Sequence, residues 1–332
     1  MIKLRKLRKL MSLGLACSLS LSVLAGCGAK AADEQVIIYS NADDEAITAM
    51  SNALDANGYE GRYIFETFGT SELGGKLLAE GTNLEADLVT MSTFYLQSAQ
   101  EQNGMFLPLE FDVNTLEAVP DYTAPITSQE GAIILNTEVL AEAGLDKPAS
   151  LQDLADPKYA GQVAVTDIQS SSTAWLMIQA LVSAYGEDGA QEVLHGIYEN
   201  AGDHIESSGS APLKLCRAGE VAIGFGLRHQ AVADKADGLP IDFVDPTEGN
   251  FSLTESVAVL DKGDATNPEA MKMAQCIIEN GRAALQQTYP NPLYEGEGAD
   301  SANKSAYPKT FDQPLTFELF SAHQALSEAA KP

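Results

Sequence analysis

Three short clusters of serine and threonine stand where strands are expected to end and helices to begin. They are Thr70-Ser71, Ser171-Ser172-Thr173 and Ser207-Ser208-Gly209-Ser210. At such positions the first backbone N–H groups of a helix lack internal partners, and the helix dipole favours an anion. Ordinary helix capping explains each cluster taken alone. Their recurrence in one chain favours an anion site, with Thr70, Ser71, Ser171, Ser172, Thr173, Ser208 and Ser210 as expected ligand contacts.

Two further segments are expected at the same edge of the fold, where strands end. Ser40-Asn41 ends one apolar run, and Arg228-His229 follows another. The planar guanidinium of Arg228 can bind a phosphate, phosphonate, sulfonate or carboxylate through two hydrogen bonds. The alternative is a surface ion pair between Arg228 and a carboxylate. His229 could contact the ligand, cap a helix or be exposed, and it has no metal-ligand partners at a recognisable spacing.

Motifs for nucleotide or catalytic chemistry were compared with the sequence and do not match. The stretch Gly69–Lys76 superficially resembles a phosphate-binding loop, but Gly75 stands where that motif requires lysine. Gly224-Phe225-Gly226 lacks the third glycine of a dinucleotide fingerprint. Neither a nucleophile–base pair nor a histidine–glutamate zinc motif is visible. We therefore expect a protein that is not an enzyme and that carries no cofactor or metal.

Strands and helices alternate along the chain and predict an α/β fold. A first unit has expected strands at Val36–Ser40, Arg62–Phe68 and Asp87–Met91, with helices between them; a second has Gln162–Asp167, Val221–Phe225 and Ile241–Val244, with a helix over Ala174–Tyr185. Each unit predicts a doubly wound sheet with flanking helices. Ligands bind such sheets outside the carboxyl ends of the strands, which is where the hydroxyl clusters fall.

Two lobes with a cleft between them follow from these two units. The expected segments are 35–130 for the first lobe, 131–245 for the second, 246–290 for the return to the first, and 291–332 packing a final helix on one lobe. Gly131–Leu135 and Ser256–Leu260 are the expected crossing strands. Cys216 and Cys276 each lie in an apolar helical pattern, which favours buried free thiols over a disulfide.

The charge balance excludes one class of partner. The chain of 332 residues has 20 Lys and Arg against 47 Asp and Glu, a formal charge of -27. A nucleic-acid-binding protein needs a basic surface instead. The length allows two domains of about 150 residues each.

The first 26 residues predict a secretory signal. Five basic residues within positions 1–9 precede an apolar, serine-rich stretch that is too short to span a membrane comfortably. The stretch ends in Leu24-Ala25-Gly26-Cys27, which resembles the bacterial lipobox; the alternative is an ordinary signal peptide with an incidental cysteine. Cleavage would leave 15 basic against 47 acidic residues, a formal charge of -32. The resemblance implies an acyl chain such as palmitate on Cys27, a tether over 27–34, and anchoring to the outer face of a membrane.

The ordered set of motifs resembles one family. Besides the lipobox, the motifs are Tyr39-Ser40, Lys76–Glu80, Glu85–Val89, Gly219–Gly224 and Asp245–Gly249. They are similar to those of extracellular solute-binding proteins of ABC transporters, in the branch that binds ferric ion or 2-aminoethylphosphonate. The resemblance implies a type II periplasmic-binding fold, hinge closure on the ligand, and delivery to a membrane permease driven by a separate ATPase.

The ligand expected from the resemblance is a small organic anion. Ferric-binding members carry adjacent tyrosines after the strand that here precedes Leu227-Arg228-His229-Gln230. Because this chain has no tyrosine pair there, a phosphonate or organophosphate is the leading expectation and iron the alternative. From other classes, a surface lipoprotein hydrolase and an adhesin stay open. We expect a monomer.

Overall fold

The computed structural model describes residues 35–332. The expected signal, the lipidation site Cys27 and the tether lie outside the described residues. Within residues 35–332, none of the helices combines the length and the apolar composition that a membrane span requires.

The first lobe is built on three parallel strands. These are β1 (Val36–Ser40), β2 (Tyr63–Thr67) and β3 (Leu88–Ser92). The buried run of β1 pairs with β2 on one side and with β3 on the other, as expected for a strand covered on both faces. The helices that follow the strands are α1 (Asp44–Leu54), α2 (Thr70–Glu80) and α3 (Thr93–Asn103).

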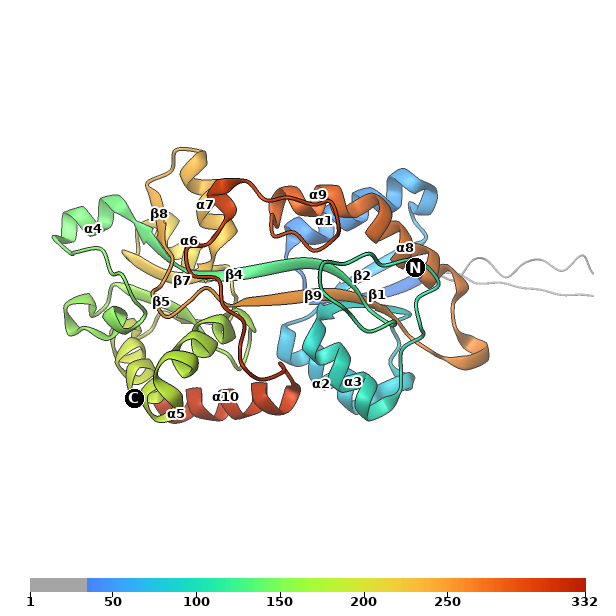
Figure 1. Ribbon diagram of the computed structural model, residues 1–332, viewed down its shortest axis with the longest axis horizontal. Coiled ribbons are helices and arrows are strands. Elements are labelled where there is room, and N and C mark those ends of the chain that lie inside the picture. Colours follow the sequence, from blue (N-terminus) through green and yellow to red (C-terminus); the bar gives the residue numbers. More distant parts are fainter. Residues whose placement is uncertain (1–34) are drawn as a thin grey trace, which may run out of the picture. The chain divides into compact units, whose positions relative to one another are not determined.

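Two long strands cross from lobe to lobe (Figure 1). They are β4 (Ala124–Asn136) and β9 (Ser252–Val259), which run antiparallel, with Thr127 opposite Glu255. The second half of β4 leaves β9 and pairs with β7 (Ile223–Leu227) and β8 (Ile241–Val244). The hydrogen-bonded order is β2-β1-β3-β9-β4-β7-β5-β6, with β8 on β4. The antiparallel pairs of β4 and β9 thereby join the parallel strands of the two lobes.

The second lobe completes the two-lobed α/β fold that the sequence predicts. Its parallel strands β5 (Val163–Thr166) and β6 (Ile205–Glu206) extend the sheet from β7. Its helices are α4 (Thr137–Ala143), α5 (Thr173–Ala201), α6 (Ala211–Ala218) and α7 (Arg228–Ala236). Helix α5 consists of two helical segments separated by a kink at Gly186, whose φ of 70° is not helical. The expected helix end at Tyr185 is therefore confirmed, and a second segment continues from the kink to Ala201.

The chain returns to the first lobe and then reaches the second again. Helices α8 (Pro268–Cys276) and α9 (Arg282–Thr288) are joined by a π-helical turn, and α10 (Phe317–Ala330) is the last helix. Helix α10 packs on α5 and also contacts α3. Phe320 of α10 packs on the rings of Phe94 and Trp175, with centroid distances of 5.2 and 4.9 Å, and these two rings also contact each other. One aromatic cluster therefore connects both lobes.

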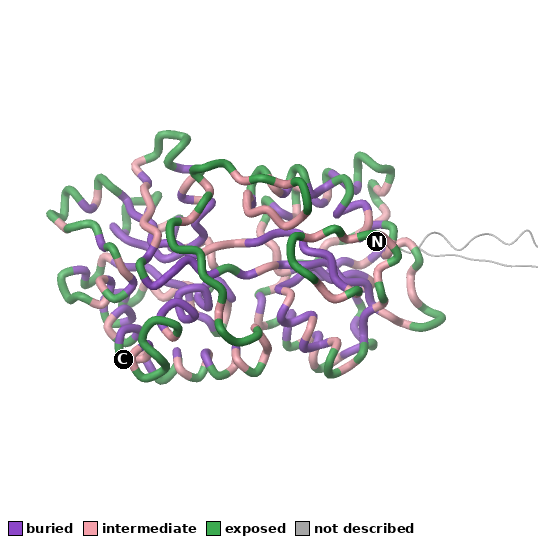
Figure 2. The backbone as a smooth tube through the Cα atoms, viewed as in Figure 1, coloured by how far each residue is buried: buried purple, intermediate pink, exposed green. Residues whose placement is uncertain are grey.

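Buried residues follow the strands of both lobes and the inner faces of the helices (Figure 2). Cys276 belongs to a cluster in the first lobe and Cys216 to a cluster in the second. Both are free and buried, which confirms the expected free thiols. Burial raises the pKa of Cys216 to about 12, so this thiol is not reactive at neutral pH.

Candidate functional site

A cavity of about 240 Å³, named here the cleft pocket, lies where the two lobes meet. The first lobe contributes Asn41, Asp43, Phe68 and Thr70; the crossing strands contribute Thr127, Gln129 and Glu255; the second lobe contributes Ser170–Thr173, Ser207–Ser210 and Leu227. The volume lies below the ~300–1,000 Å³ of drug-sized sites. The cleft pocket therefore suits a small ligand that touches both lobes.

Three helices begin at the cleft pocket without a side-chain cap. They are α2, α5 and α6, whose N-cap residues are Gly69, Ser172 and Ser210. Away from the pocket, α4, α8 and α10 are capped by the side chains of Asn136, Asn267 and Thr316, whereas α3 and α9 also lack a side-chain cap. At the cleft pocket, some first-turn N–H groups of α5 and α6 already have an acceptor: Thr173 N–H donates to Ser171 Oγ over 3.4 Å, and Ala211 N–H donates to the Ser208 carbonyl. The dipoles of α2, α5 and α6 add positive potential at all three ends. This arrangement can bind an anion without a basic side chain.

The hydroxyl clusters of the two lobes meet in the cleft pocket. Thr70 Oγ1 accepts a hydrogen bond of 3.1 Å from Asn41 Nδ2. In the second lobe Ser171 Oγ lies 3.4 Å from Thr173 Oγ1, and Ser208 Oγ lies 3.3 Å from Ser210 Oγ. Gly209 has no room for a side chain, because an added Cβ would collide with Thr173. The missing Cβ at Gly209 therefore allows the loop Ser207–Ser210 to approach the start of α5 closely.

The structure places most of the predicted contacts in this pocket. Asn41, Thr70, Ser171, Ser172, Thr173, Ser208 and Ser210 line it. Ser40 and Ser71 do not. Ser40 is fully buried and accepts hydrogen bonds from Thr90 Oγ1 and the Ala42 N–H, and the buried Ser71 hydroxyl has no partner. Both residues belong to the correct strand ends, but their side chains turn into the lobe.

Arg228 lies outside the cleft pocket. Its Nε donates to Asp245 Oδ1 over 2.7 Å, and its other nitrogens donate to Asp245 Oδ2 and to the carbonyls of Ala302 and Lys304. The guanidinium stacks over Phe243 at 4.7 Å. The pairing alternative therefore describes the structure, although the pair is buried rather than on the surface. The expected anion contact by Arg228 is therefore not supported by its position: the side chain does not line the cleft pocket, and four of its five N–H groups donate within the protein.

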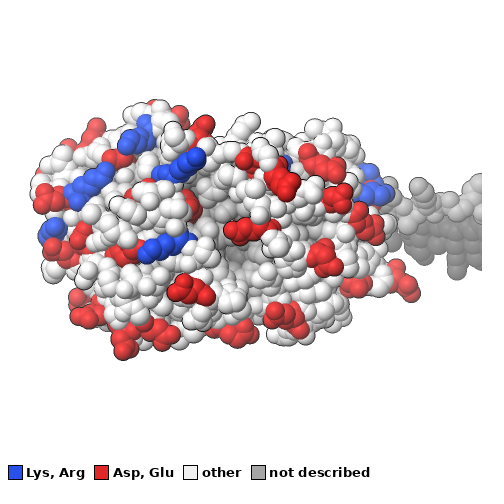
Figure 3. All heavy atoms as spheres, in the orientation of Figure 1, with Lys and Arg blue, Asp and Glu red and all other residues white. Residues whose placement is uncertain are grey.

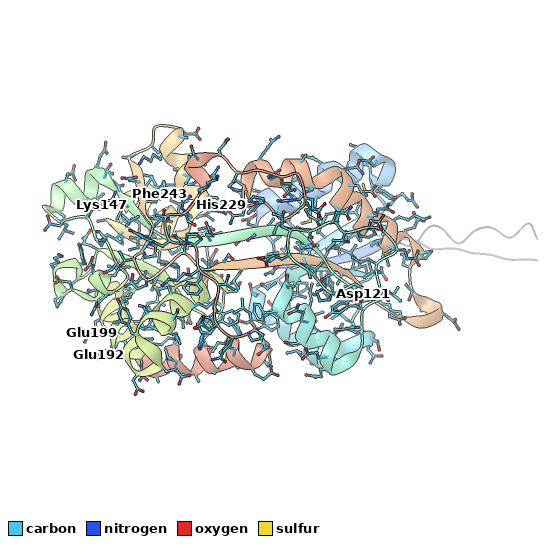
Figure 4. All side chains as sticks on the ribbon, viewed as in Figure 1. Asp121, Lys147, Glu192, Glu199, His229 and Phe243 are labelled. Carbon is cyan, nitrogen blue, oxygen red and sulfur yellow. The ribbon has the colours of Figure 1, made fainter. Side chains whose placement is uncertain are left out.

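His229 is buried on the second-lobe side (Figure 4). Its ring packs on Tyr289 with a centroid distance of 4.8 Å, and Nε2 has no hydrogen-bond partner. Burial lowers the pKa of His229 to about 4, so the ring is neutral at pH 7. His229 lines an adjoining cavity of about 850 Å³, which also contains Lys214 and Arg217 and shares Asp43, Ser208 and Ser210 with the cleft pocket.

Two carboxylates in the cleft pocket escaped the sequence reasoning. Glu255 is 7% exposed, and Asp43 accepts hydrogen bonds from the Tyr289 hydroxyl and from the Ala46 N–H. Burial raises the pKa of Glu255 to about 7 and also raises that of Asp43. The signal for Glu255 was an acid at an inward position of an apolar strand, between Leu253 and Val257. In a chain with 47 acids such a signal is easily missed.

Basic and acidic side chains are distributed differently on the face that Figure 3 shows: acids are spread over both lobes, while most visible basic groups lie over the second lobe. Among residues 35–332, none of the Lys or Arg side chains lines the cleft pocket. Over the same residues, no cluster of three His, Cys, Asp or Glu side chains could hold a metal ion.

Comparison with known proteins agrees with this geometry. Residues 49–288 match the family described as "Bacterial extracellular solute-binding protein". An uncharacterized protein of Haemophilus influenzae is 27% identical over 260 residues, which are 75% of this chain and 74% of the relative. The Fe(3+)-binding periplasmic protein of Serratia marcescens is 26% identical over 69% of this chain and 68% of its own length.

Solved structures share the fold. The periplasmic binding protein AfuA from Actinobacillus pleuropneumoniae, with fructose-6-phosphate bound, has a TM-score of 0.70 at 21% identity over 89% of this chain and 95% of its own. Iron-bound HitA from Pseudomonas aeruginosa has a TM-score of 0.69 at 20% identity over 90% and 99% of the two chains. Two lobes of this fold, a cleft between them and the matching family profile lead to one conclusion: the chain belongs to the bacterial extracellular solute-binding proteins, the substrate-binding components of ABC importers.

Proposed function

We propose that this protein captures a small anionic organic solute, a phosphonate such as 2-aminoethylphosphonate or an organophosphate, in the cleft pocket. The observation that carries the proposal is the convergence of three uncapped helix N-termini, those of α2, α5 and α6, on one pocket. They come from both lobes. A ligand that bridges them favours the closed arrangement, because only that arrangement offers contacts from both sides.

The anion needs no basic side chain in this site. One helix N-terminus contributes about 0.3–1 kcal/mol to an exposed anion and up to about 2 kcal/mol in a partly buried site. Three such termini and the hydroxyls of Thr70, Thr173 and Ser208 can replace much of the hydration of a phosphonate. The bulk charge of -27 opposes an anion only weakly, because screening limits distant surface charges to about 8–10 Å at physiological salt.

Iron is the alternative ligand, because the Serratia marcescens relative is an Fe(3+)-binding periplasmic protein and iron-bound HitA shares the fold. The cleft pocket offers two carboxylates, Asp43 and Glu255, and its lining includes neither tyrosine nor histidine among the described residues. Ferric ion prefers several charged oxygen ligands. The donor set therefore fits an organic anion better.

Delivery and anchoring complete the proposal. The solute would pass to an ABC permease with its ATPase, and the lipobox Leu24–Cys27 would attach the protein to the outer face of the membrane. Cys27→Ser should abolish incorporation of labelled palmitate in cells and release the protein from the membrane fraction. Incorporation that persists in this variant would contradict the anchoring.

The ligand is tested by titration calorimetry of the purified protein. We expect saturable binding of 2-aminoethylphosphonate or of a phosphate ester and no comparable response to ferric citrate. A bound ligand should also raise Tm, because it stabilises only the native state. Binding of iron without a response to any phosphonate or phosphate ester would overturn the proposal and favour the iron alternative. Steady hydrolysis of the ester would point to an enzyme instead.

A further inference from the structure

Glu255 occupies the centre of the sheet at the floor of the cleft pocket. On β9 it stands beside Ser92 of β3 and Thr127 of β4. Its side chain is 7% exposed and lines the pocket. Burying a carboxylate in such a place costs free energy unless it is paired with a cation and hydrogen-bonded.

The described residues leave part of this carboxylate unsatisfied. Ser92 Oγ donates to Oε1 over 2.8 Å, and Oε2 has no partner. Nearby in the pocket, Asn41 Nδ2 donates to Thr70 Oγ1, and Asn41 Oδ1 has no donor of its own. The opposite amide orientation would turn Nδ2 toward Glu255 and supply one neutral donor, but still no cation. In either orientation the pocket floor presents an acceptor of negative charge without a positive partner.

The neighbouring side chains do not compensate the charge of Glu255. The charged group that faces Glu255 from the N-cap position of α1 is Asp43, which itself accepts a hydrogen bond from the Tyr289 hydroxyl. From β3, β4 and the end of β1 the neighbours are the neutral Ser92, Thr127 and Asn41. Burial raises the pKa of Glu255 to about 7, although the hydrogen bond from Ser92 and the nearby Asn41 amide lower it. At neutral pH the site is therefore close to taking up a proton.

Building on the proposed anion pocket, we propose that the ligand is a zwitterion whose amine binds Glu255 while its oxyanion binds the helix N-termini. An ammonium group supplies the donors that Glu255 Oε2 and Asn41 Oδ1 lack. Glu255 is then the residue that selects amine-bearing solutes. A ligand that carries both an oxyanion and an ammonium group also matches a pocket whose positive potential comes from helix ends and whose negative charge comes from carboxylates.

Proton release on binding distinguishes between an ionised Glu255 that accepts hydrogen bonds from an ammonium group and a protonated Glu255 that donates to the oxyanion. A bound ammonium lowers the pKa of Glu255, so the complex releases the proton that part of the free protein carries, about half a proton near pH 7. A protonated Glu255 that donates to the oxyanion would instead retain or take up a proton. The sign can be read from binding enthalpies in two phosphate-free buffers of different ionisation enthalpy. The difference between wild type and Glu255→Gln with the same ligand isolates this carboxylate.

The decisive experiment compares 2-aminoethylphosphonate with ethylphosphonate, which lacks the amine, by calorimetry on the purified full chain. Wild type should prefer the amine by about 10- to 100-fold, the range of a hydrogen bond to a charged group. Glu255→Gln should remove most of that preference and change ethylphosphonate binding less than about threefold. Glu255→Asp, which keeps the charge, should retain part of it. Glu130→Gln is the matched control, because Glu130 is a partly buried acid on β4 outside the cleft pocket.

The outcomes separate this inference from the proposed function. Equal binding of both phosphonates, or an unchanged preference in Glu255→Gln, would overturn the role of Glu255 and leave the anion pocket standing. Binding of neither phosphonate nor any phosphate ester would overturn the anion pocket, and the zwitterion would fall with it. A proton uptake that disappears in Glu255→Gln would show a neutral, donating acid instead.

Discussion

The two sides of the cleft pocket differ in the chemistry they present to a ligand. The second lobe presents only neutral donors, with the hydroxyls of Ser171–Thr173 and Ser208–Ser210 at the starts of α5 and α6. The opposite side, formed by the first lobe and the crossing strand β9, presents Asn41 and Thr70 together with the acids Asp43 and Glu255. The difference teaches that a site can be polarised without a basic side chain: helix ends provide its positive half and buried carboxylates its negative half.

Arg228→Gln tests whether the positive half works without a cation, and it has the largest expected effect. The side chains of Arg228 and Asp245 are 5% and 11% exposed, so loss of this pair should cost about 3–5 kcal/mol of unfolding free energy. Ligand affinity should change less than about threefold. Lys147→Gln breaks the exposed pair with Asp242 and should cost no more than about 1 kcal/mol. A large loss of affinity in a folded Arg228→Gln would place this arginine in the site.

The negative half predicts a pH-dependent stability. The folded-state pKa of Glu255, about 7, lies above the ordinary value of about 4.3. The native state therefore binds more protons between these values, and stability falls as pH rises through this window. Glu255→Gln should remove that loss, which amounts to about 3–4 kcal/mol above pH 7, so the variant should exceed wild type in denaturant stability at pH 8 and not at pH 4. Parallel pH profiles of the two proteins would contradict a buried ionising Glu255.

Gly209→Ala tests the close approach between the loop and α5 in the second lobe. The added Cβ would collide with Thr173 and lie 3.1 Å from Ser171 Oγ. Overpacking of this kind costs about 1–3 kcal/mol, and because both hydroxyls would shift, we expect affinity to fall about tenfold or more. Gly75→Ala on α2 is the control, since its added Cβ meets no atom within 4 Å. Calorimetry should find unchanged affinity there.

Thr173→Val has the smallest expected effect. It removes one hydroxyl at the first residue of α5 while keeping the shape of the side chain. A neutral hydrogen bond is worth about 0.5–1.5 kcal/mol, so affinity should fall about three- to tenfold. Thr137→Val makes the same change at the first residue of α4, outside the pocket, and should not alter affinity. Equal effects of the two variants would remove Thr173 from the site.

Local patterns succeeded where a strand, a loop and a helix follow one another directly. Helix starts were predicted from the runs Thr70-Ser71 and Ser171–Thr173. Both runs follow the carboxyl ends of strands, and both contribute residues to the lining of the cleft pocket. Within a run the pattern did not show which side chain faces the cleft. Ser71 turns inward although its neighbour Thr70 lines the pocket, because the helix rotates by about 100° per residue.

Local patterns did not predict the role of residues whose partners are distant in the sequence. Arg228 stands at the expected strand end, but Asp245, 17 residues away, captures its guanidinium. Glu255 carries no local mark that separates it from the other acids. Its place on β9 became meaningful only when β3 and β4 enclosed it.

The sequence by itself determined the two-lobed α/β fold and the hydroxyl clusters at the helix starts, because hydrophobic periodicity and capping residues act over a few neighbouring positions. Only the tertiary structure decided which charges meet the ligand. It paired Arg228 with Asp245, left Glu255 without a cation, and brought α2, α5 and α6 to one pocket. The physical reason is that the energy of a charge depends on burial and on partners from distant segments, neither of which a local pattern records.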